Sequence, residues 1–216
     1  MNGLRITLAA GVAAAMALVC MPAQADEQSG FALGVRTGYG VPMGSAKSGL
    51  TLASLDGGMI PFWLDLGYRF SPNLYVGAFF QYALTFPPVH SCPPGGSCNG
   101  NDLRGGIDFQ YHFMPHDTFD PWAGLGVGYE ATRVFNESAS FDETSDIYHG
   151  IQFIDVQLGA DLRVSKTVPF GPFLDFSLGQ FSKESLKDVN GNSSDIPMTS
   201  TMHEWLTLGV RGQFNL

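Results

Sequence analysis

The sequence carries little charge and lacks long apolar runs in its body. Only 14% of its 216 residues are charged, whereas soluble domains carry about a quarter. After residue 25, no apolar run approaches the ~20 residues that a membrane helix needs. The hydrophobic fraction of 44% is too high for intrinsic disorder. The chain is therefore too apolar for a typical soluble domain and too interrupted for a helical membrane protein.

Basic residues are also scarce. Eleven lysines and arginines stand against 20 acidic residues, which gives a net charge of −9. A nucleic-acid binder needs a basic stripe to displace the counterions of phosphates, and peripheral attachment to an anionic leaflet needs the same sign of charge. The composition argues against both kinds of partner.

The N-terminus has the pattern of an export signal. Arg5 provides a positive start, residues 6–21 are apolar or small, and Ala23-Gln24-Ala25 has the form of a cleavage site. We expect a signal peptide over residues 1–25, cut between Ala25 and Asp26, and one β-barrel domain over residues 26–216. A retained membrane helix is the weaker alternative, because the run is short and is followed at once by small and acidic residues.

Removal of the signal leaves two cysteines, Cys92 and Cys98. An even pair in an exported chain predicts a disulfide, and the intervening Pro-Pro-Gly-Gly can turn the chain back on itself. With His90 these residues form an incomplete tetrahedral metal set. We therefore predict a disulfide and neither a metal nor a cofactor.

The body of the chain alternates between apolar and mixed residues with a period of two, which is typical of strands. In the second segment Ile60, Phe62 and Leu64 share one face, while Trp63 and Asp65 share the other. The pattern predicts eight strands, at residues 31–41, 59–70, 74–86, 103–113, 123–130, 154–164, 170–179 and 205–216.

The mixed face decides between a soluble sheet and a membrane barrel. It holds glycines, hydroxyls and isolated charges rather than a coat of lysine and glutamate. The four lysines beyond the signal, Lys47, Lys166, Lys183 and Lys187, all fall in predicted connections. Both observations follow if the apolar face meets lipid and the mixed face lines a lumen. A soluble lipocalin-like carrier would need the apolar face inside, which the charges on the mixed face oppose.

The predicted connections alternate in length. Those at 42–58, 87–102, 131–153 and 180–204 are long, whereas those at 71–73, 114–121 and 165–167 are short. Outer-membrane barrels show this alternation, with short periplasmic turns and long external loops. We expect both termini in the periplasm, an acidic exposed loop at 136–146 and a mobile exposed loop at 183–201.

Aromatic residues coincide with the predicted strand ends on the lipid face, as in the girdles of membrane barrels. The periplasmic set is Phe31, Phe70, Phe113, Phe170 and Phe214, and the external set is Tyr39, Phe62, Phe86 and Tyr129.

An eight-stranded barrel has an interior just wide enough for side chains to fill. The inward charges are expected to form a nearly balanced salt-bridge network of five basic and six acidic groups. They are Arg36, Asp65, Arg69, Arg104, Asp108, Glu130, Asp155, Asp161, Arg163, Asp175 and Arg211. The alternative is a narrow channel or conduit for small solutes, because the inward glycines leave room for water.

Catalysis is not expected. The pair His90 and Ser91 are sequence neighbours whose side chains point in opposite directions. His203, beside Glu204 near the external rim, lacks a marked nucleophile. The acidic loop at 136–146 matches no defined calcium-ligand spacing.

The export signal, the eight alternating strands and the final Phe214-Asn215-Leu216 resemble the small outer-membrane barrels related to outer membrane proteins A, W and X. The resemblance implies an all-β, antiparallel, up-and-down transmembrane barrel in a Gram-negative-type outer membrane. It further implies a monomer that contacts outer-membrane lipid and is inserted by the barrel-assembly machinery. The expected role is structural or surface-interactive, carried by the loops.

Overall fold

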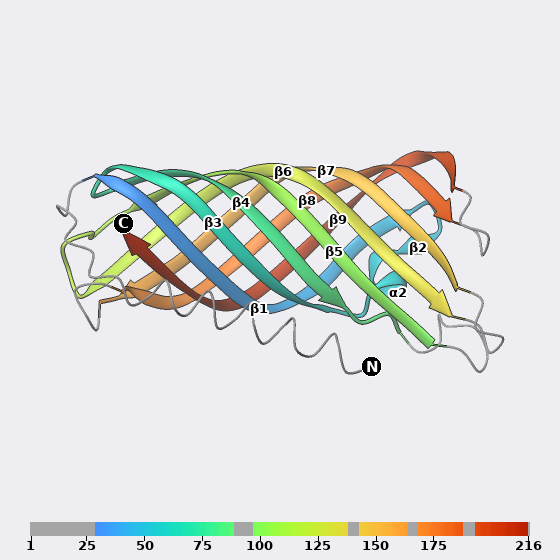
Figure 1. Ribbon diagram of the computed structural model, residues 1–216, viewed down its shortest axis with the longest axis horizontal. Coiled ribbons are helices and arrows are strands. Elements are labelled where there is room, and N and C mark those ends of the chain that lie inside the picture. Colours follow the sequence, from blue (N-terminus) through green and yellow to red (C-terminus); the bar gives the residue numbers. More distant parts are fainter. Residues whose placement is uncertain (1–28, 89–96, 138–142, 164–167, 188–192, 216) are drawn as a thin grey trace.

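The computed structural model describes residues 29–88, 97–137, 143–163, 168–187 and 193–215, which form one closed antiparallel barrel (Figure 1). Each long strand pairs with the next, and the first pairs with the last to close the sheet. This confirms the predicted eight-stranded barrel. The strands are β1 (Gly30–Lys47), β3 (Met59–Ser71), β4 (Leu74–Thr85), β5 (Ser97–His112), β6 (Phe119–Glu137), β7 (Glu143–Leu162), β8 (Phe170–Lys187) and β9 (Ser193–Asn215).

The two ends of the barrel differ. The turn end, at the left of Figure 1, holds the end of β9 and the short connection between β3 and β4. The loop end, at the right, holds the short strand β2 (Leu50–Thr51), which pairs with β1, and the single-turn helix α2 (Leu52–Leu55). Gly49 permits the tight turn into β2 because its φ of 80° lies in the left-handed region. Within the described residues, no helix has the length and apolarity to cross a membrane.

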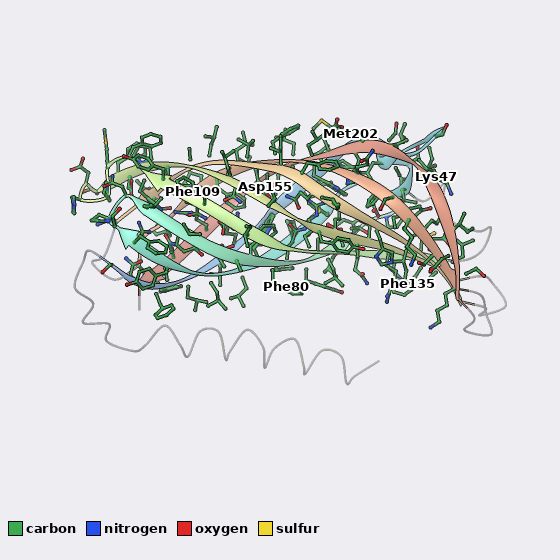
Figure 2. The ribbon with its side chains drawn as sticks, turned by 90° about the horizontal axis from the view of Figure 1, so that it is seen from above. Lys47, Phe80, Phe109, Phe135, Asp155 and Met202 are labelled. Carbon is green, nitrogen blue, oxygen red and sulfur yellow. The ribbon has the colours of Figure 1, made fainter. Side chains whose placement is uncertain are left out.

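Alternation along each strand separates an apolar outer wall from a charged interior. Large apolar side chains such as Phe80, Leu125 and Leu208 are more than half exposed, while Asp155 is 3% exposed. Figure 2 places Phe80 on the outer surface and Asp155 within the barrel. A soluble sheet would bury such an apolar face. The pleat that exposes these residues sends their neighbours inward.

Aromatic side chains gather on the outer wall near the turn end. Phe31, Phe70 and Phe113 are exposed, and Tyr68 packs edge-on between Phe31 and Phe70 at ring-centroid distances of 5.4 and 5.0 Å. Phe170 is exposed as well, but Phe214, predicted in the same girdle, is half-buried beside Leu33 in the closing pair. Tyr39, Phe62, Phe86 and Tyr129 are exposed nearer the loop end, as the pattern predicts.

The strands at the loop end are longer than the sequence pattern predicts. The expected loop at 136–146 is mostly strand, because β6 reaches Glu137 and β7 begins at Glu143. In the expected loop at 183–201, residues 183–187 belong to β8 and residues 193–201 belong to β9, and the two strands pair from Lys187 and Ser193 onward. Lys47, Lys183 and Lys187 therefore lie in strands rather than in connections. Lys166 lies outside the described residues.

Candidate functional site

The candidate site is the lumen, and its first layer lies at the turn end. Arg211 on β9 donates two hydrogen bonds to Asp161 on β7, at 2.9 and 2.6 Å, and a third to Gln110 on β5 at 2.7 Å. Its guanidinium lies 3.6 Å from the ring centroid of Trp122. Since β5, β7 and β9 are not neighbours, these contacts cross the lumen from wall to wall.

A second arginine completes this layer. Arg69 donates to Gln213 at 2.8 Å, and His112 Nδ1 lies 2.8 Å from Asp120 Oδ2. Potential ligand atoms of His112, Asp120 and Asp161 all lie within 4.8 Å of one another. A cation there would face the guanidiniums of Arg69 and Arg211, whose Nη2 atoms lie 3.4 and 3.5 Å from His112 Nε2. The arrangement is that of an ion-pair network rather than a cation site.

An aromatic cluster lies in the lumen next to this layer, on the side of the loop end. Its members come from four strands and are Trp63, Phe79, Trp122 and Phe173. Trp63 and Phe173 meet edge-on across the barrel, with ring centroids 5.6 Å apart. Arg36 lies over both rings, at 5.1 and 5.8 Å, and donates to Asp65 through Nε and Nη2 at 2.9 and 2.7 Å.

Glycines on the strands accommodate these rings. A Cβ at Gly159 would lie 2.5 Å from the Trp122 ring, and one at Gly106 would lie 2.7 Å from the Phe79 ring. A Cβ at Gly209 would likewise lie 2.7 Å from the Phe173 ring. The expectation that the glycines leave room for water is wrong at these three positions, because a ring lies against each of them.

The charged layer towards the loop end is centred on Arg104. It donates to Asp102 at 2.6 Å, to Glu130 at 2.8 Å and across the barrel to Ser177 at 2.9 Å. His203 Nε2 lies 2.7 Å from Glu130, and its ring stacks on Phe181 at 4.0 Å.

A cluster of buried apolar side chains, called the apolar plug below, lies on the loop-end side of Arg104. It consists of Ala46, Leu52, Met59, Ala83, Tyr148, Phe181 and Trp205, all buried and drawn from α2 and the strands around it. Leu52 is the contribution of α2 and is completely buried. The first connection therefore folds into the barrel instead of projecting from it.

Asp56 lies directly after α2, outside the strands, and is fully buried. Burial raises the pKa of its carboxyl from 3.8 to about 7, and the nearby charges of Asp102 and Glu130 act in the same direction. Further out, Lys47 and Glu184 form an ion pair at 2.9 Å.

Ten of the eleven charged residues predicted to face the lumen are buried, in the layers described above or between them. Arg163 is different: its side chain is 32% exposed just beyond β7, 3.9 Å from Asp120. The prediction missed four buried acids, Asp56, Asp102, Asp120 and Glu184. Strand bounds drawn one residue further out would have captured Asp102.

The expected balance of charge in the lumen is wrong. Among the described residues, the buried arginines are Arg36, Arg69, Arg104 and Arg211, and the buried acids are ten in number. Much of the acidic excess of the sequence therefore lies inside the barrel rather than in the loops. Those acids are Asp56, Asp65, Asp102, Asp108, Asp120, Glu130, Asp155, Asp161, Asp175 and Glu184.

The remaining predicted positions lie mostly outside the described residues. Ala25, Asp26, His90 and Cys92 are all in that group, so the cleavage site and the bridge to Cys98 stay predictions. Cys98 itself lies near the start of β5.

Together the fold and the lumen define a class: small, closed, eight-stranded β-barrels with an apolar outer wall and a packed, charged interior. No protein-family model and no curated protein matches the sequence. Solved structures do. Neisserial surface protein A superposes with a TM-score of 0.52 at 13% identity, covering 87% of this chain and 99% of its own. A major outer membrane protein from Thermus thermophilus gives 0.51 at 12% identity, covering 86% and 99%. At these identities the likeness establishes the fold.

Proposed function

We propose that the chain is an outer-membrane barrel of a Gram-negative-type bacterium, with its outer wall in contact with lipid. The exposed apolar band and the aromatic residues at its edges support this placement, because a water-exposed wall of this kind would associate. The fold shared with an outer membrane protein and a bacterial surface protein points the same way.

We further propose that the lumen is closed by its own side chains and that the role is structural or surface-interactive. The observation that carries this is the set of contacts across the barrel: Arg211 to Gln110, Trp63 to Phe173, and Arg104 to Ser177. They occur at three levels, and the apolar plug lies beyond them. A solute crossing the barrel would have to break every layer.

An enzymatic role is not part of this proposal. The two histidines buried in the lumen each face an acid, His112 with Asp120 and His203 with Glu130. The buried hydroxyl of Ser177 accepts a hydrogen bond from Arg104. A nucleophile needs a base within hydrogen-bond reach, and the hydroxyl of Ser177 is bound to Arg104 rather than to a histidine.

The resemblance to small outer-membrane barrels supplies the remaining parts of the proposal, which concern export, assembly and orientation. The exported chain loses residues 1–25 and is inserted by the barrel-assembly machinery. It acts as a monomer, with both termini in the periplasm and a Cys92–Cys98 bridge in an external loop. The strand ends and connections at the loop end are the part available to an external partner.

Conductance in a planar bilayer tests the closed lumen. We expect the refolded chain to give no stable single-channel steps, because the charged layers and the plug fill the lumen. Stable steps that disappear in Arg104→Met or Asp108→Asn would instead support the narrow channel and overturn the closed-barrel proposal. Folding of each variant is checked beforehand by its mobility in an unboiled gel.

A further inference from the structure

The basic side chains that lie outside the lumen gather on one side of the barrel. In the described part of the chain, four arginines are buried in the lumen, Lys47 is paired with Glu184, and Arg163 lies near the turn end. The remaining lysines and arginines are Arg133 on β6 and Lys183 and Lys187 on β8. All three lie near the loop end. A local excess of positive charge, on a chain whose net charge is −9, favours an anionic partner at that place.

The strand register places these cations around Ile147 on β7. Arg133 lies opposite Ile147 on β6, and on β8 Lys183 and Lys187 stand on either side of the residue opposite Ile147. His149 follows two residues along β7, on the same face as Ile147. Residues in such positions have Cβ atoms roughly 5–8 Å apart, so their long side chains can reach one anion over Ile147. We call this group the basic patch; it consists of Arg133, His149, Lys183 and Lys187.

The basic patch faces outward. Thr132, Tyr148 and Glu184, which alternate with its members along β6, β7 and β8, are buried in the barrel. Side chains of successive strand residues point to opposite faces. The two lysines are exposed, while Arg133 and His149 are half-buried.

The patch has donor capacity that the protein itself does not use. The Nε atom of Arg133 is buried and has no hydrogen-bond acceptor within the described residues, and the guanidinium lies 5.5 Å from the ring centroid of Phe135, near the loop end (Figure 2). A buried donor requires a partner. Lys183 forms an ion pair with Asp195 at 2.7 Å, but both side chains are about half exposed. Exposed pairs are weak, so this lysine can also serve an anion.

The patch lies at the edge of the apolar outer wall. Tyr129 and Ile151 pair with each other one row closer to the turn end, and both are about half exposed. The rings of Tyr129 and His149 lie 6.3 Å apart. Phe153 and Leu125 continue the exposed apolar surface towards the turn end. A lipid with its acyl chains on this wall would hold its headgroup at the level of the patch, whereas an acidic protein or a free anion would make no use of the wall.

We propose that the basic patch binds the phosphate group of an anionic lipid in the leaflet at the loop end. This inference rests on the membrane placement proposed above. Phosphate oxygens accept charge-assisted hydrogen bonds from guanidinium and ammonium groups, and a phosphate over Ile147 supplies the acceptor that Arg133 Nε lacks. The acyl chains of the lipid lie against Tyr129, Ile151 and Phe153.

Lipid binding in detergent micelles tests the site. The chain is refolded in a neutral detergent, phosphatidic acid or a diacylglycerol with the same acyl chains is added, and native mass spectrometry measures the bound lipid. We expect saturable binding of phosphatidic acid and no saturable binding of diacylglycerol. Arg133→Gln should weaken the binding of phosphatidic acid by about tenfold or more, because a charged hydrogen bond is lost. Arg133→Lys keeps the charge and should lose less.

Arg163→Gln is the matched control, since it removes one arginine near the turn end, and its binding should equal that of the parent. Equal losses in Arg133→Gln and Arg163→Gln would show a general attraction of charge and would overturn the proposal. Tighter binding of a polyglutamate peptide than of phosphatidic acid would assign the patch to an acidic protein and would overturn it too.

Failure of the lipid site is separable from failure of the membrane placement. A protein whose gel mobility changes on boiling, but which binds phosphatidic acid no better than diacylglycerol, would overturn the lipid site alone. Mobility that does not change on boiling, in a protein soluble without detergent, would overturn the placement and the site with it.

Discussion

Single residues decide how the interior fills. An eight-stranded barrel is narrow, yet it holds the rings of Trp63, Phe79, Trp122 and Phe173. It can do so because rings lie directly against glycines, where any larger residue would collide with them. The period-two pattern shows that these glycines face the same side as the charges. It does not show which ring lies against which glycine, because the partners are far apart in the sequence.

Gly159→Ala tests this packing. Its Cβ would lie 2.5 Å from the Trp122 ring, so the ring or the strand must move, and overpacking of this kind costs about 1–3 kcal/mol. The urea midpoint in micelles measures the loss.

Gly105→Ala is the comparison, because the nearest atom to its Cβ would be a backbone oxygen 3.7 Å away. There the substitution should be neutral or stabilise by about 0.4–1 kcal/mol through the unfolded state. Equal effects of the two alanines would show that the ring contact does not limit stability.

At the scale of elements, the sequence predicts where strands exist better than where they end. Inside the apolar band every second residue must be apolar, and the eight segments stand out. Beyond the band the alternation is lost, since the consecutive residues Ser194, Asp195 and Ile196 of β9 are all exposed. Nothing in such a stretch distinguishes a strand from a loop. Helix α2 is equally invisible, since one turn has no periodicity to detect.

The connection containing α2 should respond to pH through Asp56. Burial raises the pKa of Asp56 in the folded chain to about 7 from 3.8, so the folded state binds its proton more tightly than the unfolded state. The contribution of Asp56 to stability is fully present at low pH, falls as the pH rises from about 4 to about 7, and is flat above that.

Asp56→Asn removes that dependence. We expect the variant to match the parent closely at pH 4 and to exceed it at pH 8, by on the order of 4 kcal/mol for a pKa difference of this size. Urea midpoints taken at both pH values give the comparison, with Asp117→Asn as an exposed control. A variant that is less stable than the parent at pH 8 would contradict the assignment.

At the scale of the whole molecule, the low charge content and the acidic excess have separate causes. The outer wall is apolar, so few charges are needed on the surface. The acids that remain are concentrated inside, where ten are buried against four arginines among the described residues. The sequence pattern places most of these charges on the inward face. The sequence pattern does not reveal the excess of acids over arginines inside the barrel. That excess depends on four acids outside the predicted strands, Asp56, Asp102, Asp120 and Glu184.

An apolar outer wall around a charged interior predicts how the molecule behaves in detergent. Its backbone hydrogen bonds close on themselves without an edge, so we expect the folded barrel to resist SDS until it is heated. The unboiled protein should therefore run on an SDS gel as a compact band that shifts on boiling, and it should fractionate with the outer membrane on a density gradient. Its exposed apolar wall requires detergent or lipid for solubility. A protein that stays soluble without detergent, and whose gel mobility is the same before and after boiling, could not have this wall facing lipid, and the proposed membrane placement would fail with it.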